Sequence, residues 1–293
     1  MTLRALIERA EAKLRTSPHP DRARLDAETL MLHVLRQNRA WLIAHIDDEA
    51  EPSIEPEYTG LVAERLSGKP IQYITGNSEF FGLPFSVGPG VLIPRPETEH
   101  LVEEVIHLVK QSSLSEPHIL DIGTGSGIIA VAIAHALPHA RITAVDLSAQ
   151  ALLIARENAN RNHVTDRIQF LEGDLLTPVA GVQFHIIASN PPYVPASDHD
   201  SLAVEVREHE PHTALFAGDD GLDIYRRLIP EAREHLQPEG WLLLEIGHGQ
   251  QDAIDKILQD HGYSKVRFIQ DYQGIPRVAV AQLSVDAVAT IEP

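Results

Sequence analysis

The sequence predicts an α/β protein in which a mostly parallel, Rossmann-like sheet is preceded by a small helical bundle. Three observations lead to this fold class. From about residue 100 onward, short apolar runs alternate with helical segments, which is typical of a parallel sheet with helices on both faces. Before residue 70, apolar residues recur only at helical spacing. A glycine-rich turn follows the first expected strand of the sheet.

Residues 1–70 are expected to form a helical domain. Residues 1–17 carry apolar side chains at helical spacing, and the prolines of Ser17-Pro18-His19-Pro20 end that helix. Asp21 is expected to cap a second helix, a third covers Arg39–His45, and a fourth covers Glu55–Leu66. The acidic surface of this bundle is either a solvated face or a docking face for a partner.

Residues 71–98 are expected to form a β-hairpin and a linker. The segments Pro70–Gly76 and Glu79–Gly82 alternate and turn like hairpin strands.

The linker ends in Leu92-Ile93-Pro94-Arg95-Pro96-Glu97-Thr98-Glu99, which two prolines stiffen. Glu97 and Glu99 fall in the first turn of the next helix, where the helix dipole favours acids, and capping could explain both. The alternative is a connector that closes over a cofactor and carries Arg95 and Glu99 to the site.

Residues 99–293 are expected to form the sheet domain, followed by a frayed tail over about the last ten residues. The expected strands are His118–Asp121, Arg141–Asp146, Ile168–Leu171, Phe184–Ala188, Gly240–Glu245, Lys265–Gln270 and Arg277–Ala281. The expected helices are Glu99–Lys110, Ile128–Ala136, Ala149–Asn160, Asp223–His235 and Gln250–His261.

Composition narrows the functional classes. The 293 residues are 43% hydrophobic and 23% charged, with a formal net charge of −18, which argues against a protein that grips a nucleic-acid backbone. There is no cysteine, so thiolate chemistry and disulfides are excluded. No metal site is expected, because the 16 histidines include no His-Glu-x-x-His pattern. No apolar run predicts a membrane span or a signal core, so a cytoplasmic location is expected.

A glycine-rich turn, Asp121-Ile122-Gly123-Thr124-Gly125-Ser126-Gly127, lies between the first expected strand and its helix. Glycines let a ligand approach the backbone at a helix N-terminus. Asp146 ends the second strand and can accept both hydroxyls of a ribose, while Asp174 follows the third strand and could accept an adenine amine.

Two cofactors compete for this turn. Gly125-x-Gly127-x-x-Ala130 satisfies one form of the dinucleotide pattern. However, an acid at Asp121 would repel a pyrophosphate and suits the amino group of a methionine moiety. The layout therefore favours S-adenosylmethionine (SAM).

A second motif, Ser189-Asn190-Pro191-Pro192-Tyr193, ends an expected buried strand. Two prolines remove backbone donors and leave rigid carbonyl oxygens free to accept. The Asn190 side chain and the Pro191 carbonyl can then grip a planar –NH2 group, with Tyr193 packed on or beside its plane. Beside a SAM site, this predicts methyl transfer to a planar nitrogen by positioning and electrostatics.

At these motifs the sequence resembles the HemK/PrmC family of protein-(glutamine-N5) methyltransferases, which modify peptide chain release factors. The resemblance covers nearly the whole chain. It includes Arg24–Glu28, Pro70–Gly76, Pro94–Glu99, Asp121–Gly127, Asp146, Ser189–Tyr193 and Asp271…Gly274…Arg277.

The resemblance implies a substrate, the glutamine of the Gly-Gly-Gln motif of release factors, with S-adenosylhomocysteine as product. It implies that the helical domain helps to dock the release factor. It also implies glutamine contacts at Asn190, Pro191, Pro192 and Tyr193, and SAM contacts at Gly123, Thr124, Gly125, Ser126, Gly127, Asp146 and Asn190, with Asp174 as a variable position.

Other functions stay open at this point. A sister group methylates a ribosomal-protein glutamine with nearly the same motifs. Adenine-N6 nucleic-acid methyltransferases share Asn-Pro-Pro-Tyr, but they need a basic face and a target-recognition region. A SAM sensor without turnover would have no need of Asn190-Pro191-Pro192-Tyr193.

Overall fold

The computed structural model describes residues 1–112 and 114–284, and the expected C-terminal tail lies almost wholly outside them. The described chain forms two compact units. We call Met1–Asn77 with Leu202–Glu210 the helical unit, and Ser78–Ser201 with the described chain from Pro211 onward the sheet unit. No described helix has the length and apolar character needed to cross a membrane.

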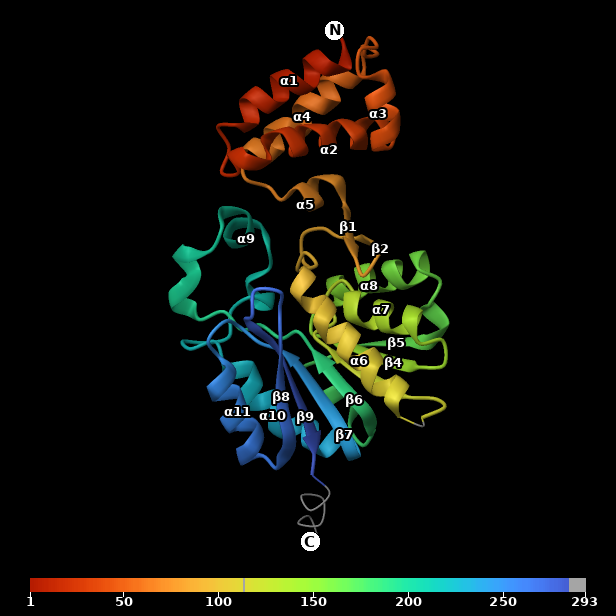
Figure 1. Ribbon diagram of the computed structural model, residues 1–293, viewed down its shortest axis with the longest axis vertical. Coiled ribbons are helices and arrows are strands. Elements are labelled where there is room, and N and C mark those ends of the chain that lie inside the picture. The colour runs from red at the N-terminus through yellow and green to blue at the C-terminus, as the bar shows by residue number, and fades with distance from the viewer. Residues whose placement is uncertain (113, 285–293) are drawn as a thin grey trace. The chain divides into compact units, whose positions relative to one another are not determined.

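The helical unit is built almost entirely from helices (Figure 1). Those before residue 77 pack around an apolar core of their own. Leu6, Ile7 and Met31 are fully buried there, and the Tyr58 hydroxyl donates to the carbonyl oxygen of Ala27 at 2.9 Å. Its helices are α1 (Leu3–Leu14), α2 (Ala23–Leu35), α3 (Arg39–His45), α4 (Ile54–Leu66), α5 (Ile71–Thr75) and the later α9 (Val204–His209).

Two local predictions in this unit are wrong. Asp21 does not cap α2, because Pro20 starts a short 3-10 turn over Pro20–Arg22 and α2 follows it without a side-chain cap. Pro70–Gly76 is not a hairpin strand but contains α5. Gly76 ends this helix in the left-handed conformation at φ 69°, while Ile71 packs into the helical core.

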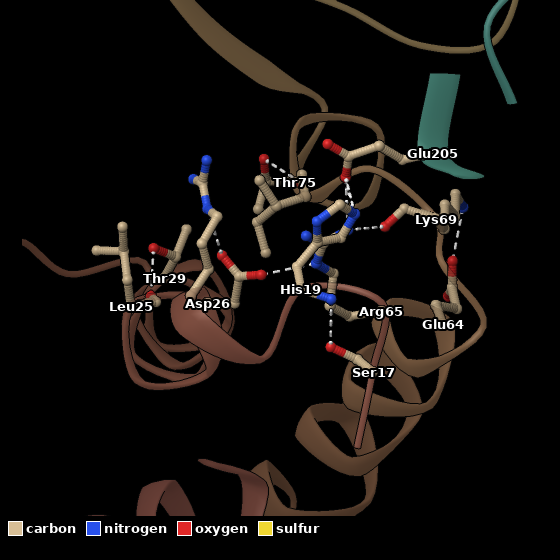
Figure 2. A network of polar contacts seen from close by, with 12 residues as sticks. Ser17, His19, Leu25, Asp26, Thr29, Glu64, Arg65, Lys69, Thr75 and Glu205 are labelled. Carbon is tan, nitrogen blue, oxygen red and sulfur yellow. Dashed lines mark hydrogen bonds and ion pairs between the residues drawn. The ribbon is translucent and has the colours of Figure 1, made fainter. Parts of the chain in front are cut away.

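A buried ionic cluster joins three distant segments of the helical unit (Figure 2). Arg65 is 2% exposed; its Nε donates to Asp26 Oδ2 at 2.7 Å and its Nη1 to Glu205 Oε2 at 2.9 Å. The same Nη1 lies 2.9 Å from the carbonyl oxygen of Lys69, and His19 Nε2 lies 3.2 Å from Glu205 Oε2. Residues 202–210 therefore belong to the fold of the helical unit, although the sequence places them within the later part of the chain.

The expected hairpin occurs one segment later than Pro70–Gly76. Strands β1 (Asn77–Phe80) and β2 (Leu83–Ser86) are joined through Phe81 and Gly82, both at positive φ. The Glu99 carboxylate accepts from the backbone N–H of Phe81 at 2.8 Å and so fixes the turn.

The sheet unit confirms the predicted α/β class. Its seven strands have the order β5-β4-β3-β6-β7-β9-β8, and only β9 runs antiparallel to the others. The strands are β3 (His118–Ile122), β4 (Arg141–Asp146), β5 (Ile168–Glu172), β6 (Phe184–Ser189), β7 (Leu236–Glu245), β8 (Tyr263–Gln270) and β9 (Pro276–Leu283).

Helices cover both faces of this sheet (Figure 1). One core layer contains side chains of α6 (Glu99–Gln111), α7 (Ile128–Ala136) and α8 (Ala149–Arg161). The other contains side chains of α10 (Asp223–His235) and α11 (Gln251–Asp260). The chain runs from β3 outward through β4 and β5, and then returns to β6 on the other side of β3. Ligand sites in such sheets form at this switch point, beyond the carboxyl ends of the strands.

Candidate functional site

A cavity of about 400 Å³ opens at the switch point of the sheet unit. The ends of β3, β4 and β6 meet there, and the segment Gly90–Ile93 with Arg95 forms another part of the wall. Among its lining residues are Gly123, Thr124, Gly125, Ser126, Asp146, Asp174, Asn190, Pro191 and Pro192. The fold therefore brings the glycine-rich turn and most of the Asn-Pro-Pro-Tyr motif to one cavity.

The glycine-rich turn is tied to the neighbouring strand. The backbone N–H groups of Gly123 and Thr124 both donate to the carbonyl oxygen of Val145, at 2.8 and 3.0 Å. Gly123, Gly125 and Gly127 have φ values of 69°, 56° and 84°, a region that side chains with a Cβ adopt only with strain. The turn therefore exposes backbone to the cavity at the N-terminus of α7.

Asp146 holds the turn from the end of β4. Its Oδ2 accepts from the N–H of Gly125 at 2.7 Å, and its Oδ1 accepts from the N–H of Ser148 at 2.9 Å. Each carboxylate oxygen retains capacity for a further donor from the cavity. Burial raises the pKa of this carboxyl, and the two backbone donors oppose the rise.

Asp121 is completely buried at the end of β3. Its Oδ2 accepts from the Thr124 hydroxyl at 2.6 Å and from the N–H of Ala130 at 3.2 Å, while Oδ1 has no partner among the described residues. Burial raises the pKa of Asp121 to about 7, although both hydrogen bonds favour the charged form. Asp121 thus braces the turn from below, with one oxygen still able to accept.

Asp174 lies at the rim of the cavity and already has a partner. Its Oδ2 accepts from Arg227 Nη2 at 2.6 Å, and both side chains are about half exposed. The predicted contact with an adenine amine therefore has to compete with, or share, this ion pair.

Asn190 follows the end of β6, where Ser189 Oγ donates to the carbonyl oxygen of Ile122 at 2.7 Å. The Asn190 Nδ2 donates to Thr98 Oγ1 at 3.2 Å. Pro191 and Pro192 continue along the cavity wall without backbone donors. Carbonyl and amide oxygens at this wall can accept hydrogen bonds from a planar amide or amine.

Tyr193 packs behind this wall and does not line the cavity described above. Its hydroxyl lies 3.3 Å from Glu245 Oε1, and its carbonyl oxygen accepts from Gln250 Nε2 at 3.0 Å. A Cβ on Gly221 would lie 2.3 Å from the Tyr193 carbonyl oxygen, so only glycine allows this close approach. Burial and the neighbouring Glu245 raise the pKa of Tyr193. The aromatic ring is thus fixed by its surroundings.

Comparison with known proteins decides the family. A model for the methyltransferase small domain matches residues 99–209, and one for the PrmC N-terminal domain matches residues 5–76. A release factor glutamine methyltransferase of Koribacter versatilis is 42% identical over 96% of this chain and 99% of its own length. The chain belongs to the release factor glutamine methyltransferase family.

Further relatives agree with this family. A release factor glutamine methyltransferase of Geobacter sulfurreducens is 42% identical over 88% of this chain and 89% of its own length. Among solved structures, a methyltransferase from Pyrococcus furiosus covers 77% of this chain and 99% of its own, with 21% identity and a TM-score of 0.52. That likeness supports the methyltransferase fold of the chain.

No role was predicted from the sequence for two buried residues, Thr98 and Glu245. Thr98 Oγ1 donates to Glu245 Oε2 at 2.6 Å, and the two residues are 0% and 2% exposed. A signal for Glu245 existed, since it is an acid at the carboxyl end of the apolar strand β7. Of the connector residues, Arg95 lines the cavity whereas Glu99 binds the hairpin turn.

Proposed function

We propose that this chain transfers a methyl group from SAM to the side-chain amide nitrogen, N5, of the glutamine in the Gly-Gly-Gln motif of peptide chain release factors. The observation that carries the proposal is one cavity with two different walls. The glycine-rich turn and Asp146 form one wall, and Asn190, Pro191 and Pro192 form another. Membership of the release factor glutamine methyltransferase family supports the choice of substrate.

The residues present fit SAM. The exposed backbone from Gly123 to Ser126 would lie against the methionine part, and Asp146 would accept from the ribose hydroxyls. Gly127, also predicted to contact SAM, does not line the cavity. Buried Asp121 has one oxygen without a partner among the described residues, which suits an ammonium group. Asp121 does not line the cavity, so this contact would require the glycine-rich turn to move. Asp174 would accept from the adenine amine while it keeps Arg227. A cavity of about 400 Å³ falls within the range of small-ligand sites.

When bound, SAM would supply a methyl group on a positively charged sulfur. The amide nitrogen of glutamine is a weak nucleophile, because its lone pair is delocalised into the carbonyl. Asn190 Oδ1 and the Pro191 carbonyl oxygen would accept from its two N–H groups, which orients the nitrogen and favours a pyramidal geometry. The nitrogen would take up the methyl carbon as the bond from that carbon to the sulfur breaks, with the bonding electron pair left on the sulfur. The nitrogen would then lose a proton to water, so no strong base is needed.

Tyr193 would act from behind the Asn-Pro-Pro wall. The Glu245 and Gln250 contacts hold it in place, so that it would support the wall from outside the cavity. The predicted packing of its ring on or beside the plane of the bound amide would require the ring to reach the cavity. Because its pKa is raised, the hydroxyl stays neutral and adds no charge next to the substrate.

The proposed division of labour follows the chain. Residues 1–70 would help to dock the release factor, and residues 99–293 would carry most of the methyltransferase site. Within residues 71–98, the hairpin and linker would begin after α5, and Gly90–Ile93 with Arg95 would complete the cavity wall. Because release factors act in translation, we propose that the enzyme works in the cytoplasm.

The test is a methyl-transfer assay with labelled SAM. The acceptors are an unmodified release factor, the same factor with its Gly-Gly-Gln glutamine changed to alanine, a ribosomal protein fraction, and adenine-containing DNA. Label on the intact factor but not on the alanine form is the expected result. Label on ribosomal protein alone or on DNA alone would overturn the release factor assignment.

An Asn190→Ala variant separates an enzyme from a SAM sensor. Removal of the acceptor oxygen should lower kcat by about 100-fold, while SAM affinity measured by calorimetry falls far less. Equal loss of turnover and SAM binding would contradict the proposed role of Asn190 toward the amide.

A further inference from the structure

Glu245 is a buried carboxylate at the end of β7 that does not line the cavity. Any effect that it has on a ligand in the cavity must therefore pass through the residues that it contacts. Oε2 accepts from Thr98 Oγ1 at 2.6 Å and Oε1 lies 3.3 Å from the Tyr193 hydroxyl. The Tyr225 hydroxyl donates to the Glu245 backbone oxygen at 2.6 Å and fixes the main chain. Thr98 is in turn 3.2 Å from Asn190 Nδ2.

The number of protons on the Glu245 carboxyl and the Thr98 hydroxyl determines which group donates in each of these hydrogen bonds. An ionised carboxylate only accepts, so Thr98 must give its single hydroxyl proton to Glu245. The 2.6 Å distance lies in the range of a bond to a charged oxygen. With that proton used, Thr98 Oγ1 can only accept from Asn190.

The direction fixes which end of the Asn190 amide faces the cavity. The Nδ2 group is bound to Thr98, so Oδ1 is the end that remains for a ligand in the cavity that Asn190 lines. The proposed grip on a substrate –NH2 group requires an acceptor there. If the Asn190 amide were reversed, its Nδ2 group would face the substrate –NH2 group, and two hydrogen-bond donors would oppose each other.

Protonation of Glu245 would remove this constraint. A neutral carboxyl can donate to Thr98, which then becomes free to donate to Asn190 and to turn the amide round. Burial raises the pKa of Glu245 to about 7. The charged and titratable groups around it are Tyr193, Tyr225, Glu97, which favours the neutral form, and Arg277, which favours the ionised form.

We infer that Glu245 is a positioning residue that orients the Asn190 amide through Thr98, so that the Asn190 oxygen faces the methyl-accepting nitrogen. The inference rests on the proposed function and adds to it the residues that set the acceptor geometry. It also gives a role to Thr98, which is fully buried and which, like Arg95, lies among the residues that line the cavity.

Two substitutions at Thr98 form a matched pair. Thr98→Val keeps the shape and removes the hydroxyl, and Thr98→Ser keeps the hydroxyl. We expect Thr98→Val to lower kcat by about 10- to 100-fold, because misplacement of a reacting group by a small distance has effects of this size. SAM affinity should change less than about 3-fold, and Thr98→Ser should recover most of kcat.

Glu245→Gln tests the charge. The wild-type kcat should rise with pH toward a plateau above about 7, as Glu245 ionises, and this rise should be absent in Glu245→Gln. Tyr225→Phe is the control, since it removes a buried hydrogen bond to the Glu245 backbone and leaves the side-chain relay intact. It should keep the pH-dependent rise.

A second readout does not depend on turnover. The side-chain –NH2 signals of Asn190 in a ¹H–¹⁵N spectrum, assigned by their loss in Asn190→Ala, should shift with pH near 7 in the wild type but not in Glu245→Gln. Wild-type kcat in Thr98→Val, or a pH dependence that survives in Glu245→Gln, would overturn the inference. If Thr98→Val fails to bind SAM or to fold, the Glu245→Gln comparison decides.

The variants are compared on whichever acceptor the wild type methylates. Lack of activity on release factors would therefore overturn the substrate assignment and leave this comparison readable. If no acceptor is methylated, the Asn190 signals alone decide.

Discussion

At the scale of single residues, two buried carboxylates support different parts of the cavity wall. They are Asp121 and Glu245. Asp121 is the penultimate residue of β3 and Glu245 the last residue of β7, and each accepts a short hydrogen bond from a threonine hydroxyl, 2.6 Å in both cases. Burial raises the pKa of both to about 7. Neither reaches the cavity wall directly, so both act by ordering a loop: Asp121 the glycine-rich turn, and Glu245 the Asn190 amide.

Asp121 should make stability depend on pH. Its folded pKa of about 7 lies above the unfolded value of 3.8, so the folded state binds more protons between those values. The free energy of unfolding should therefore fall as pH rises from about 4 to 7, by up to about 1.4 kcal/mol per pH unit from this group. Urea titrations over this range should show a shallower fall for Asp121→Asn. Parallel curves for the two proteins would contradict the raised pKa.

At the scale of elements, the glycine-rich turn also sets how closely two helices approach. A Cβ added to Gly127, just before α7, would lie 3.1 Å from the Cβ and 3.2 Å from the Cα of Ala155 on α8. Gly127 also has a φ of 84°. The third glycine of the motif therefore serves packing of α7 on α8, while Gly123 and Gly125 face the cavity.

Gly127→Ala tests this packing, and Gly82→Ala is the control, because Gly82 also has a positive φ but has open space around an added Cβ. Gly82, in the β1–β2 turn, has a φ of 69° and nothing within 4 Å of an added Cβ. Gly82→Ala should lower the free energy of unfolding by about 1 kcal/mol from backbone strain alone. Gly127→Ala should cost about 1–3 kcal/mol more, because the added methyl overpacks the core. Equal losses in urea unfolding would show that the approach of α8 is unimportant.

At the scale of the whole molecule, the chain contributes to the helical unit twice. Residues 202–210 are continuous at both ends with the sheet unit, and they follow the Asn190–Tyr193 motif by only a few residues. Their anchor is Glu205, which shares buried Arg65 with Asp26. Glu205 thereby ties this later stretch of the chain to Arg65 and Asp26 within the helical unit.

Arg65→Met should destabilise the helical unit strongly. Removal of the guanidinium leaves Asp26 Oδ2 without its donor, so that the buried carboxylate loses its Arg65 partner. Breaking such a buried pair costs about 3–5 kcal/mol of folding free energy. Hydrogen exchange should accelerate in α2, α4 and residues 202–210. Arg4→Ala is the control, because the Arg4–Asp47 pair is 45% and 74% exposed and should contribute little. Similar exchange in the two variants would refute the importance of the buried cluster.

Much of the fold follows from sequence pattern. Glycine, proline and apolar periodicity predicted α3, α7, α10 and β4 with the bounds that the structure shows, because local backbone preferences and burial agree in those elements. The strand prediction for Pro70–Gly76 was wrong because seven residues are too few to separate a helical from an extended period. The packing of Ile71 on the helical core decided it.

The sequence by itself determined the α/β class, the glycine-rich turn, and the proline-stiffened segment Asn190-Pro191-Pro192 at the end of a buried strand. These depend on glycine and proline, whose backbone restrictions act within a few residues. Only the tertiary structure decided that Glu245 meets Thr98, 147 positions earlier, and that Arg65 meets Glu205, 140 positions later. In each pair a buried charged side chain meets a partner that is distant in the sequence, and sheet order and the return of the chain bring the two together. No local pattern along the sequence encodes such a meeting.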